Sequence, residues 1–354
     1  MASLTINGRR IGPGEPTYVV AELSGNHRQH FDDAVALLRA AREAGADAVK
    51  LQTYTPATVT LDCDRPDFLV PSDNPAWRGR RLWDLYEEAH TPWAWHAPLK
   101  AVADGLGLDL FSSPFDATAV EFLEGLGMPA YKVASFELVD LPLIERIART
   151  GRPMIVSTGM ATTDEIADAL AAARGAGARE IALLKCTSAY PAPPDDMNLA
   201  MIPRLAERFG VPVGLSDHTL APAVAIGAVA LGACIVEKHL TLSRAAGGPD
   251  GAFSLEPAEF RGLVDAIRTV ERSLGSGEPV VTESERANRV FRRSLYVVED
   301  VPAGAPFTEK NVRSIRPAYG LAPRHLHEVL GRRAARAVER GTPLAWDLIE
   351  GGRP

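Results

Sequence analysis

Short apolar runs alternate with amphipathic stretches from residue 17 to residue 273 of the chain. The runs are bounded by turn-forming residues, which predicts strands, whereas the longer stretches repeat apolar positions every three or four residues, which predicts helices. We expect strands over residues 17–23, 47–54, 108–111, 130–134, 154–156 and 181–185, and in the runs that lead into His218 and His239. We expect helices over residues 31–44, 97–105, 117–125, 141–149, 163–174, 199–209, 221–231 and 257–273.

Eight successive strand-helix units predict an α/β protein with a (β/α)8 TIM barrel, in which chemistry takes place at the C-terminal ends of the strands. An open doubly wound sheet alternates in the same way, but it does not need polar side chains after all eight strands. Here polar side chains follow every predicted strand, so the barrel is favoured. The candidates on the strands up to residue 190 are Glu22, Lys50, Gln52, Ser113, Lys132, Ser135, Glu137, Ser157, Ser188 and Tyr190.

Two histidines stand at the ends of neighbouring predicted strands, His218 after a run that includes Ser216 and His239 after the next run. Adjacent parallel strands would bring the two imidazoles side by side. With the acidic neighbours Asp217 and Glu237 they can hold a divalent metal and leave coordination positions open for substrate or water, as a catalytic ion requires. The alternative is that both histidines are satisfied polar residues that only close off strands.

The pattern of apolar and polar residues changes after the last predicted helix. Residues 1–274 form the predicted barrel domain, and residues 275–290 are polar and turn-rich, which is typical of a linker. Residues 291–354 contain short apolar pieces separated by glycine and proline, which predicts a small β-rich module. Such a module is too small to hold an active site by itself, so we expect it to cap, recognise or dimerise.

Composition narrows the range of partners. The chain has 354 residues, of which 46% are hydrophobic, and a net charge of −7 with no dense Lys/Arg stripe, which argues against nucleic acid as the main partner. No stretch approaches the roughly 18 apolar residues of a membrane span. The N-terminus lacks the charged start and apolar run of a signal peptide, and Cys63, Cys186 and Cys234 read as reduced thiols. We therefore expect a cytoplasmic protein.

Several blocks of sequence carry a resemblance to a known family. They are AELSGNH (21–27), KLQTYTP (50–56), LYEEAHTPWAWHAP (85–98), FSSPFD (111–116), YKVASFE (131–137), STGM (157–160), LKCTSAYP (184–191), GLSDHT (214–219), EKH (237–239), GGPD (247–250), FRRSLY (291–296) and IRP (315–317). The chain resembles the sialic acid synthase family, a barrel followed by an antifreeze-like SAF domain, and within it the pseudaminic branch most. Gly25 departs from the pattern, in which alanine is expected.

The resemblance implies a metal-dependent condensation of phosphoenolpyruvate with the open-chain aldehyde of an aminosugar, giving a nine-carbon 2-keto acid and phosphate. For the pseudaminic branch the sugar would be 2,4-diacetamido-2,4,6-trideoxy-altrose; the neuraminic and legionaminic precursors stay open as alternatives. The residues suit this reaction, because a dianionic phosphate and a carboxylate need cations surrounded by hydroxyl and amide donors. By resemblance the phosphoenolpyruvate ligands are Lys50, Gln52, Ser113, Lys132, Ser135, Ser157, Ser188 and Ser216.

The resemblance also implies the remaining roles. His218 and His239 would hold a divalent ion such as Mn²⁺, Mg²⁺ or Co²⁺, and two histidines with carboxylates and water accept zinc as well. Tyr190 and Asp250 would contact the sugar, and Arg316 would reach it from the small module of the partner in a domain-swapped homodimer. Glu22 and Glu137 are the candidates for the base that activates water. For both acids the alternative is an ion pair with Lys50 or Lys132.

Two rival functions remain open at this point. A Schiff-base aldolase on the same barrel would use Lys132 or Lys50 as an amine nucleophile, with the histidines merely structural. The antifreeze-like module, taken alone, suggests ice or carbohydrate binding. Ice binding requires a flat and relatively apolar face, whereas Arg292, Arg293, Arg313 and Arg316 make this module basic. Chelator inhibition supports the metal enzyme, whereas borohydride trapping of a covalent adduct supports the aldolase.

Overall fold

The structure is a computed structural model of the chain and describes residues 2–71 and 76–353. The chain divides into two compact units, Met1–Gly275 and Ser276–Pro354. Each unit has a hydrophobic core of its own.

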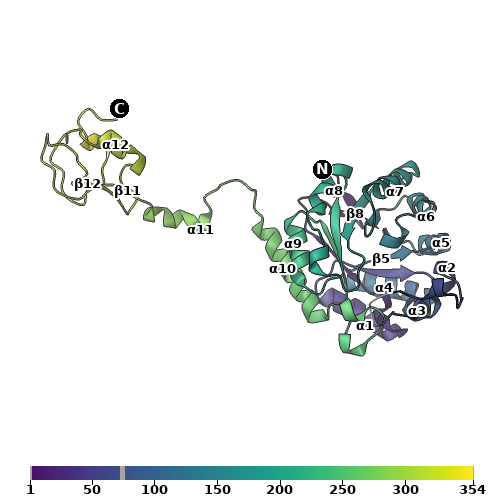
Figure 1. Cartoon of the computed structure of the whole chain (residues 1–354). Coiled ribbons are helices and arrows are strands. Elements are labelled where there is room, and N and C mark those ends of the chain that lie inside the picture. The colour runs from purple at the N-terminus through teal and green to yellow at the C-terminus, as the bar shows by residue number, and fades with distance from the viewer. Residues whose placement is uncertain (1, 72–75, 354) are drawn as a thin grey trace. The chain divides into compact units, whose positions relative to one another are not determined.

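Eight parallel strands of the first unit close into a barrel, in which β10 pairs with β3 to complete the ring. Each strand leads into at least one helix on the outside of the barrel (Figure 1). The predicted (β/α)8 fold is therefore confirmed. The strands are β3 (Tyr18–Glu22), β4 (Ala48–Thr53), β5 (Asp109–Pro114), β6 (Tyr131–Val133), β7 (Met154–Ser157), β8 (Ile181–Cys186), β9 (Val213–Asp217) and β10 (Ile235–His239).

The outer helices begin and end close to the predicted positions. Helix α7 shows why, because Thr162 and Glu165 form a reciprocal capping box at its N-terminus. The outward side chains of the strands pack against these helices and form the larger core. The helices are α1 (Phe31–Glu43), α4 (His96–Leu106), α5 (Ala117–Gly125), α6 (Leu141–Ala148), α7 (Thr163–Gly175), α8 (Met201–Phe209), α9 (Pro222–Ala230) and α10 (Pro257–Ser273).

An N-terminal hairpin, which the sequence analysis did not predict, closes the end of the barrel at which the strands begin. Strands β1 (Leu4–Ile6) and β2 (Arg9–Ile11) pair in antiparallel fashion around Asn7 and Gly8, both at positive φ. Its buried apolar side chains join a core cluster with the inward residues near the starts of the barrel strands, such as Val20 and Ile155. The N-terminal half of the lumen is thus an apolar plug.

A long excursion, residues 54–95, separates β4 from α4. It contains α2 (Pro56–Val59), η2 (Pro66–Phe68), α3 (Leu82–Ala89) and η3 (Trp93–Trp95). Gln29 ties it to the first βα loop by donating from its side-chain amide to the carbonyls of Glu88 and His90, at 3.1 and 2.5 Å. Short 3₁₀ turns also follow several strands: η1 (Ser24–His27), η4 (Ser135–Glu137), η5 (Pro194–Asp196), η6 (Arg244–Ala246) and η7 (Gly251–Phe253).

The second unit is built around the antiparallel pair β11 (Ser294–Val297) and β12 (Val312–Ile315). Leu295, Val297, Phe307 and Leu344 are among its fully buried core residues. Its other elements are α11 (Glu283–Arg286), η8 (Ala287–Phe291), η9 (Pro323–His325), α12 (Leu326–Val329) and η10 (Trp346–Leu348). Across the described ranges of both units, no helix is both long and apolar enough to span a membrane.

Candidate active site

The C-terminal half of the barrel lumen is polar, because the inward positions change from apolar to polar along the strands. On β3 the inward residues are Val20 and then Glu22, and on β4 they are Ala48 and then Lys50. Glu22 is fully buried and Lys50 is 3% exposed. Ionisable groups are buried this deeply only when they are paired or serve a function, so this end of the barrel is the candidate site.

Lys50 lies at the centre of a buried charge network. Its Nζ is 2.7 Å from Glu22 Oε2 and 3.7 Å from Glu237 Oε1, and it donates to Ser113 Oγ at 3.2 Å. Gln52 Nε2 donates to the other oxygen of Glu22 at 2.9 Å. Burial raises the pKa of Glu22 against the attraction of Lys50, and the nearby Glu237 carboxylate adds to the rise. Two carboxylates thus face one ammonium.

The second lysine of the lumen, Lys132, is 1% exposed and donates to the backbone oxygen of Val133 at 2.8 Å. Burial lowers the pKa of its ammonium, while the Glu237 carboxylate opposes this effect. Ser216 Oγ in turn donates to Glu237 Oε1 at 3.2 Å. A bound anion beside Lys132 would favour its charged form.

Three serines converge where β6, β7 and β8 end. Ser135 Oγ accepts a hydrogen bond from the Gly159 amide at 3.1 Å. A Cβ at Gly159 would lie 2.2 Å from Ser188 Oγ and 2.7 Å from Ser135 Oγ, so glycine allows these loops to approach. Ser157 Oγ is buried and finds no partner among the described residues. A buried hydroxyl without a partner calls for an explanation, so Ser157 is a candidate for contact with a ligand.

His218 and His239 lie side by side, with ring centroids 5.3 Å apart. His218 Nδ1 is 3.0 Å from the Thr187 carbonyl and can donate to it, which leaves Nε2 free. His239 Nδ1 is buried and has no partner within the described part of the chain. Burial, together with the charges of His218 and Lys50, lowers the pKa of His239 well below its usual value. Burial acts to lower the pKa of His218, but its contacts with Cys186 and the Thr187 carbonyl raise it above its usual value. His239 is therefore the neutral imidazole that suits a metal, and His218 would bind a divalent ion after losing its proton.

One part of the predicted metal environment is wrong. Asp217 faces away from the lumen, because adjacent residues of a strand point to opposite sides, and it pairs with Lys238 at 2.7 Å. Glu237, which is on the same side of β10 as His239, does face the lumen. Among residues 2–71 and 76–353, no group of three or more His, Cys, Asp or Glu side chains has a metal-binding arrangement. The histidine pair would therefore leave most coordination positions open.

Glu137 differs from Glu22 in its surroundings. Burial raises the pKa of Glu137 to about 7, against the attraction of Lys132. Its Oε2 is buried without a hydrogen-bond partner in the described ranges. For Glu22 the alternative of an ion pair holds, because Glu22 pairs with Lys50 at 2.7 Å. Glu137 forms no such pair with Lys132, since no carboxylate oxygen lies within 4.0 Å of the Lys132 ammonium in the described residues. A carboxyl group with a pKa near neutrality suits proton transfer.

The residues predicted to contact a sugar fall into two groups. Asp250 accepts from the Ser24 hydroxyl and from the Gly25 amide at 3.1 Å, and burial raises its pKa to about 6. The Tyr190 ring lies 4.4 Å from that of His218. Both therefore belong to the mouth of the barrel. Arg316 follows β12 in the second unit, and its contact with a sugar stays a prediction.

The unexpected Gly25 has a packing reason. A Cβ at this position would lie 3.3 Å from both Cα and Cβ of Ala89 and 3.4 Å from Pro249. The distances to Ala89 are tighter than ordinary van der Waals contact, so an alanine would require the end of α3 to shift slightly. Glycine thus lets the excursion sit close to the loop that carries Asp250.

Sequence reasoning missed the aromatic residues that line the mouth. Phe253 is 1% exposed, and its ring lies 4.9 Å from that of His239. Trp77 of the excursion lies 5.3 Å from the ring of Tyr190. A signal for Phe253 was present, because it belongs to the same glycine-rich loop as Asp250. Trp77 lies in irregular sequence between two predicted elements and carried no comparable signal.

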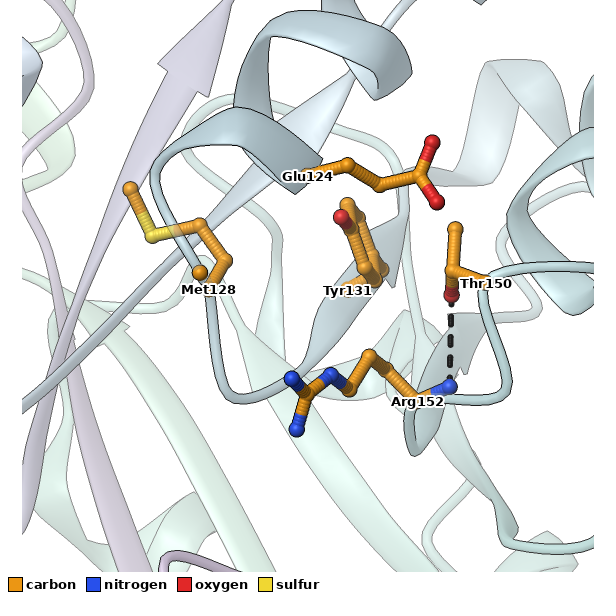
Figure 2. A pocket seen from close by; sticks show the side chains of 6 residues that line it. Glu124, Met128, Tyr131, Thr150 and Arg152 are labelled. Atoms are coloured by element: carbon orange, nitrogen blue, oxygen red, sulfur yellow. Dashed lines mark hydrogen bonds between the residues drawn. The ribbon is translucent and has the colours of Figure 1, made fainter.

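A small cavity of about 130 Å³ lies elsewhere on the barrel (Figure 2). It is lined by residues that precede or begin β6 and β7, at the N-terminal ends of the strands. In this fold that end serves stability rather than chemistry, so we assign it no catalytic role. The lining residues are Glu124, Gly127, Met128, Tyr131, Thr150 and Arg152.

Comparisons with known proteins point to one family. The NeuB family matches residues 37–279, and the SAF domain matches residues 292–350. A Helicobacter pylori protein named pseudaminic acid synthase is 44% identical over 337 residues, covering 95% of this chain and 98% of its own. A Campylobacter jejuni protein of the same name is 43% identical over 92% of this chain and 95% of its own. The crystal structure of the Bacillus subtilis spore coat polysaccharide biosynthesis protein spsE matches with 33% identity and a TM-score of 0.66, covering 98% of this chain and 99% of its own.

Proposed function

Because the chain belongs to the NeuB family, we propose that it is a pseudaminic acid synthase. The substrates are phosphoenolpyruvate and the open-chain aldehyde of 2,4-diacetamido-2,4,6-trideoxy-altrose. The observation that carries this proposal is the C-terminal half of the lumen, where two buried lysines, several serines and a histidine pair face the same space. These groups match an anionic donor and a carbonyl acceptor.

In this proposal the lysines and hydroxyl groups bind phosphoenolpyruvate. Lys132 supplies a cation that is free of a carboxylate partner within 4.0 Å among the described residues, and Ser157 supplies a buried hydroxyl without a partner there. Ser135 and Ser188 lie together and offer further hydroxyl donors, and the Gly159 amide orients Ser135. Phosphate recognition by several directed donors in a buried site is strong because water does not compete for them.

The reaction joins C3 of phosphoenolpyruvate to the aldehyde carbon of the sugar. The new carbon–carbon bond takes its electron pair from the enol double bond, and the aldehyde oxygen becomes a hydroxyl after it gains a proton. Water then adds to the oxocarbenium carbon, C2 of the former phosphoenolpyruvate. Cleavage of the C2–O bond to phosphate leaves the keto group of the nine-carbon acid. We class the enzyme as a transferase on this basis.

A divalent ion such as Mn²⁺, Mg²⁺ or Co²⁺, held by His218 and His239, would supply Lewis acidity at the aldehyde oxygen. Glu137, with its pKa raised to about 7, is suited to remove the proton from the attacking water. Glu22 is the second candidate, but its ion pair with Lys50 favours a role in fixing that lysine. Asp250 and Tyr190 would orient the sugar hydroxyl groups.

We further propose a homodimer in which the second unit of the partner covers the barrel mouth. Apolar side chains are exposed on the loops around this mouth, and others are exposed on the second unit. Burying such surfaces against each other would stabilise an assembly, and Arg316 of the partner subunit would then reach the sugar. These exposed residues include Phe136, Val139, Met160 and Leu220 on the barrel, and Phe291 and Tyr319 on the second unit. The three free cysteines support a cytoplasmic setting.

Phosphate release from phosphoenolpyruvate tests the function directly. We expect release with the trideoxy diacetamido sugar, and much slower release with N-acetylmannosamine or with the legionaminic precursor. A preference for either of the latter would replace pseudaminic by neuraminic or legionaminic synthesis. Borohydride trapping of a covalent adduct with substrate would instead support the Schiff-base aldolase. The reaction proposed here forms no such adduct.

The histidine pair has its own test. His239→Ala should abolish turnover and sharply reduce the metal content of the purified protein, while the circular dichroism spectrum stays unchanged. His96→Gln is the matched control, because His96 is also buried but hydrogen-bonds to Thr53 at 2.7 Å. Unchanged metal content in the His239 variant would remove the assignment.

A further inference from the structure

Trp77 is the outermost member of a continuous set of aromatic rings at the barrel mouth. Its ring lies 5.3 Å from that of Tyr190 and 6.0 Å from that of Phe253. Those two rings lie 4.4 Å from His218 and 4.9 Å from His239, respectively. The set therefore leads from the candidate metal-binding pair, through one row of rings, to the indole of the excursion.

The position of Trp77 is fixed by a second contact. Its indole nitrogen donates to the carbonyl of Pro249 at 2.7 Å. Pro249 precedes Asp250, which in turn accepts from the Gly25 amide at 3.1 Å. The indole thus bridges the excursion to the loop that carries a predicted sugar ligand, and Trp77 as a residue is only half-buried.

We propose that Trp77 is a specificity-determining residue that contacts the C6 methyl group of the aminosugar. This inference rests on the proposed function, because it requires the aldehyde carbon to lie at His218 and His239. An open-chain sugar anchored there has its C2 and C3 beside the rings of Tyr190 and Phe253. Its C6, about 6 Å from the aldehyde carbon when the six-carbon chain is extended, then lies on the side of these rings where Trp77 stands.

The chemistry of the indole favours a methyl group at that place. A deoxy C6 buries apolar surface on the ring, whereas a hydroxymethyl C6 loses its hydration and finds no hydrogen-bond acceptor on an indole face. An apolar wall discriminates between such substrates by roughly 10- to 200-fold. The trideoxy character of the acceptor would then be read by Trp77, while the lysines and serines bind phosphoenolpyruvate alone.

The experiment compares two acceptors that differ only at C6: the 2,4-diacetamido-2,4,6-trideoxy sugar and its 6-hydroxy counterpart. We expect wild-type protein to favour the trideoxy sugar in kcat/KM by about tenfold or more. Trp77→Ala should bring this ratio close to one and leave the KM for phosphoenolpyruvate unchanged. Trp77→Phe, which keeps an apolar ring but not the bond to Pro249, should retain most of the preference.

Trp93→Ala is the matched control. Trp93 belongs to the same excursion, donates its indole N–H to the Tyr54 carbonyl at 3.2 Å and stacks on Phe122 with centroids 4.7 Å apart. Its loss should reduce stability without changing the acceptor ratio. An equal loss of kcat/KM on both acceptors in Trp77→Ala, or an equal ratio shift in Trp93→Ala, would show that Trp77 only holds the loop.

Other outcomes also decide the question. If Trp77→Ala does not fold, Trp77→Phe carries the test, because it keeps an apolar ring and lacks the bond to Pro249. Loss of most of the preference in that variant would overturn the proposal. So would a wild-type ratio near one. Wild-type protein that releases no phosphate with any acceptor would instead refute the proposed function itself, and the inference would fall with it.

Discussion

Asp217 and Lys238 form an ion pair of 2.7 Å whose two side chains are fully buried outside the barrel lumen. Each residue precedes one of the two lumen histidines in the sequence, His218 and His239. The Lys238 ammonium also donates to the Thr219 carbonyl, and Asp217 Oδ1 accepts from the Thr219 amide at 2.9 Å. The pair therefore fixes the ends of β9 and β10, and with them the relative position of the histidines.

Removal of one partner of this pair should be costly. Lys238→Met leaves an unpaired carboxylate in the interior, so we expect the free energy of unfolding to fall by about 3–5 kcal/mol. Denaturant titration measures this loss. Arg149→Met is the control, because Arg149 pairs with Glu145 on the surface and such pairs contribute less than about 1 kcal/mol. A loss for Lys238→Met no larger than the control would contradict the role given to the pair.

The two lumen lysines should differ when each is truncated. Lys132→Met removes a cation without stranding a paired carboxylate, so we expect phosphoenolpyruvate binding to weaken by about 2–5 kcal/mol with little loss of stability. Lys50→Met leaves Glu22 and Glu237 facing each other, so it should weaken both binding and folding. Isothermal titration calorimetry and denaturant titration separate the two effects. Wild-type affinity in both variants would count against the proposed donor pocket.

Activity should depend on the ionisation of Glu137. If its carboxylate accepts the proton of the attacking water, kcat/KM should rise with pH through about 7 and level off above it. Glu137→Gln should lose this rising limb of the pH profile, and its rate should fall by a factor of about 10²–10⁴. If the variant keeps the wild-type pH profile, the base is elsewhere, and Glu22 becomes the remaining candidate.

The same group makes a stability prediction with a defined sign. The pKa of Glu137 is raised in the folded state, from 4.5 to about 7, so the folded protein binds more protons than the unfolded chain between these values. Stability relative to Glu137→Gln should therefore fall as the pH rises from about 4.5 to about 7, and stay constant above that range. A difference that grows with pH would contradict the burial of this carboxyl group.

The barrel was predictable because each strand and helix can be recognised from its own local sequence. The run 181–185 and the capping residues Thr162 and Glu165, for example, need no tertiary information to be recognised. The excursion was not predictable, since its position depends on long-range contacts such as the bond between Trp77 and Pro249. The hairpin at Asn7 and Gly8 carries a local turn signal in its Asn-Gly dipeptide.

The candidate site follows the same division. Strand alternation places Glu22, Lys50 and His239 on the lumen side once the strands are known, and the same rule sends Asp217 outward. Which groups pair could not be read from the sequence, because the sharing of Lys50 between Glu22 and Glu237 depends on the register of three strands. The raised pKa of Glu137 likewise arises from burial, which only the folded chain defines.

The proposed homodimer leads to a complementation test. Arg316→Ala and His239→Ala should each be inactive alone, the first for lack of a sugar contact and the second for lack of a metal ligand. In a mixed dimer, the barrel of the Arg316→Ala chain is intact and is covered by the intact second unit of the His239→Ala chain. One of the two sites is then complete.

Mixing the two variants under conditions of subunit exchange should therefore restore activity, up to half that of the wild type in each mixed dimer. Native mass spectrometry of chains of different mass verifies the exchange. Ser314→Ala mixed with His239→Ala is the control, and this mixture should be active because the Ser314→Ala chain is itself active. Ser314 pairs with Leu295 through the backbone ladder, which the substitution leaves in place. If exchange is complete and no activity returns in the Arg316 mixture, Arg316 acts within its own subunit or outside the site. A guanidinium is suited to the expected role because its fixed donors can bind an amide oxygen and a hydroxyl together.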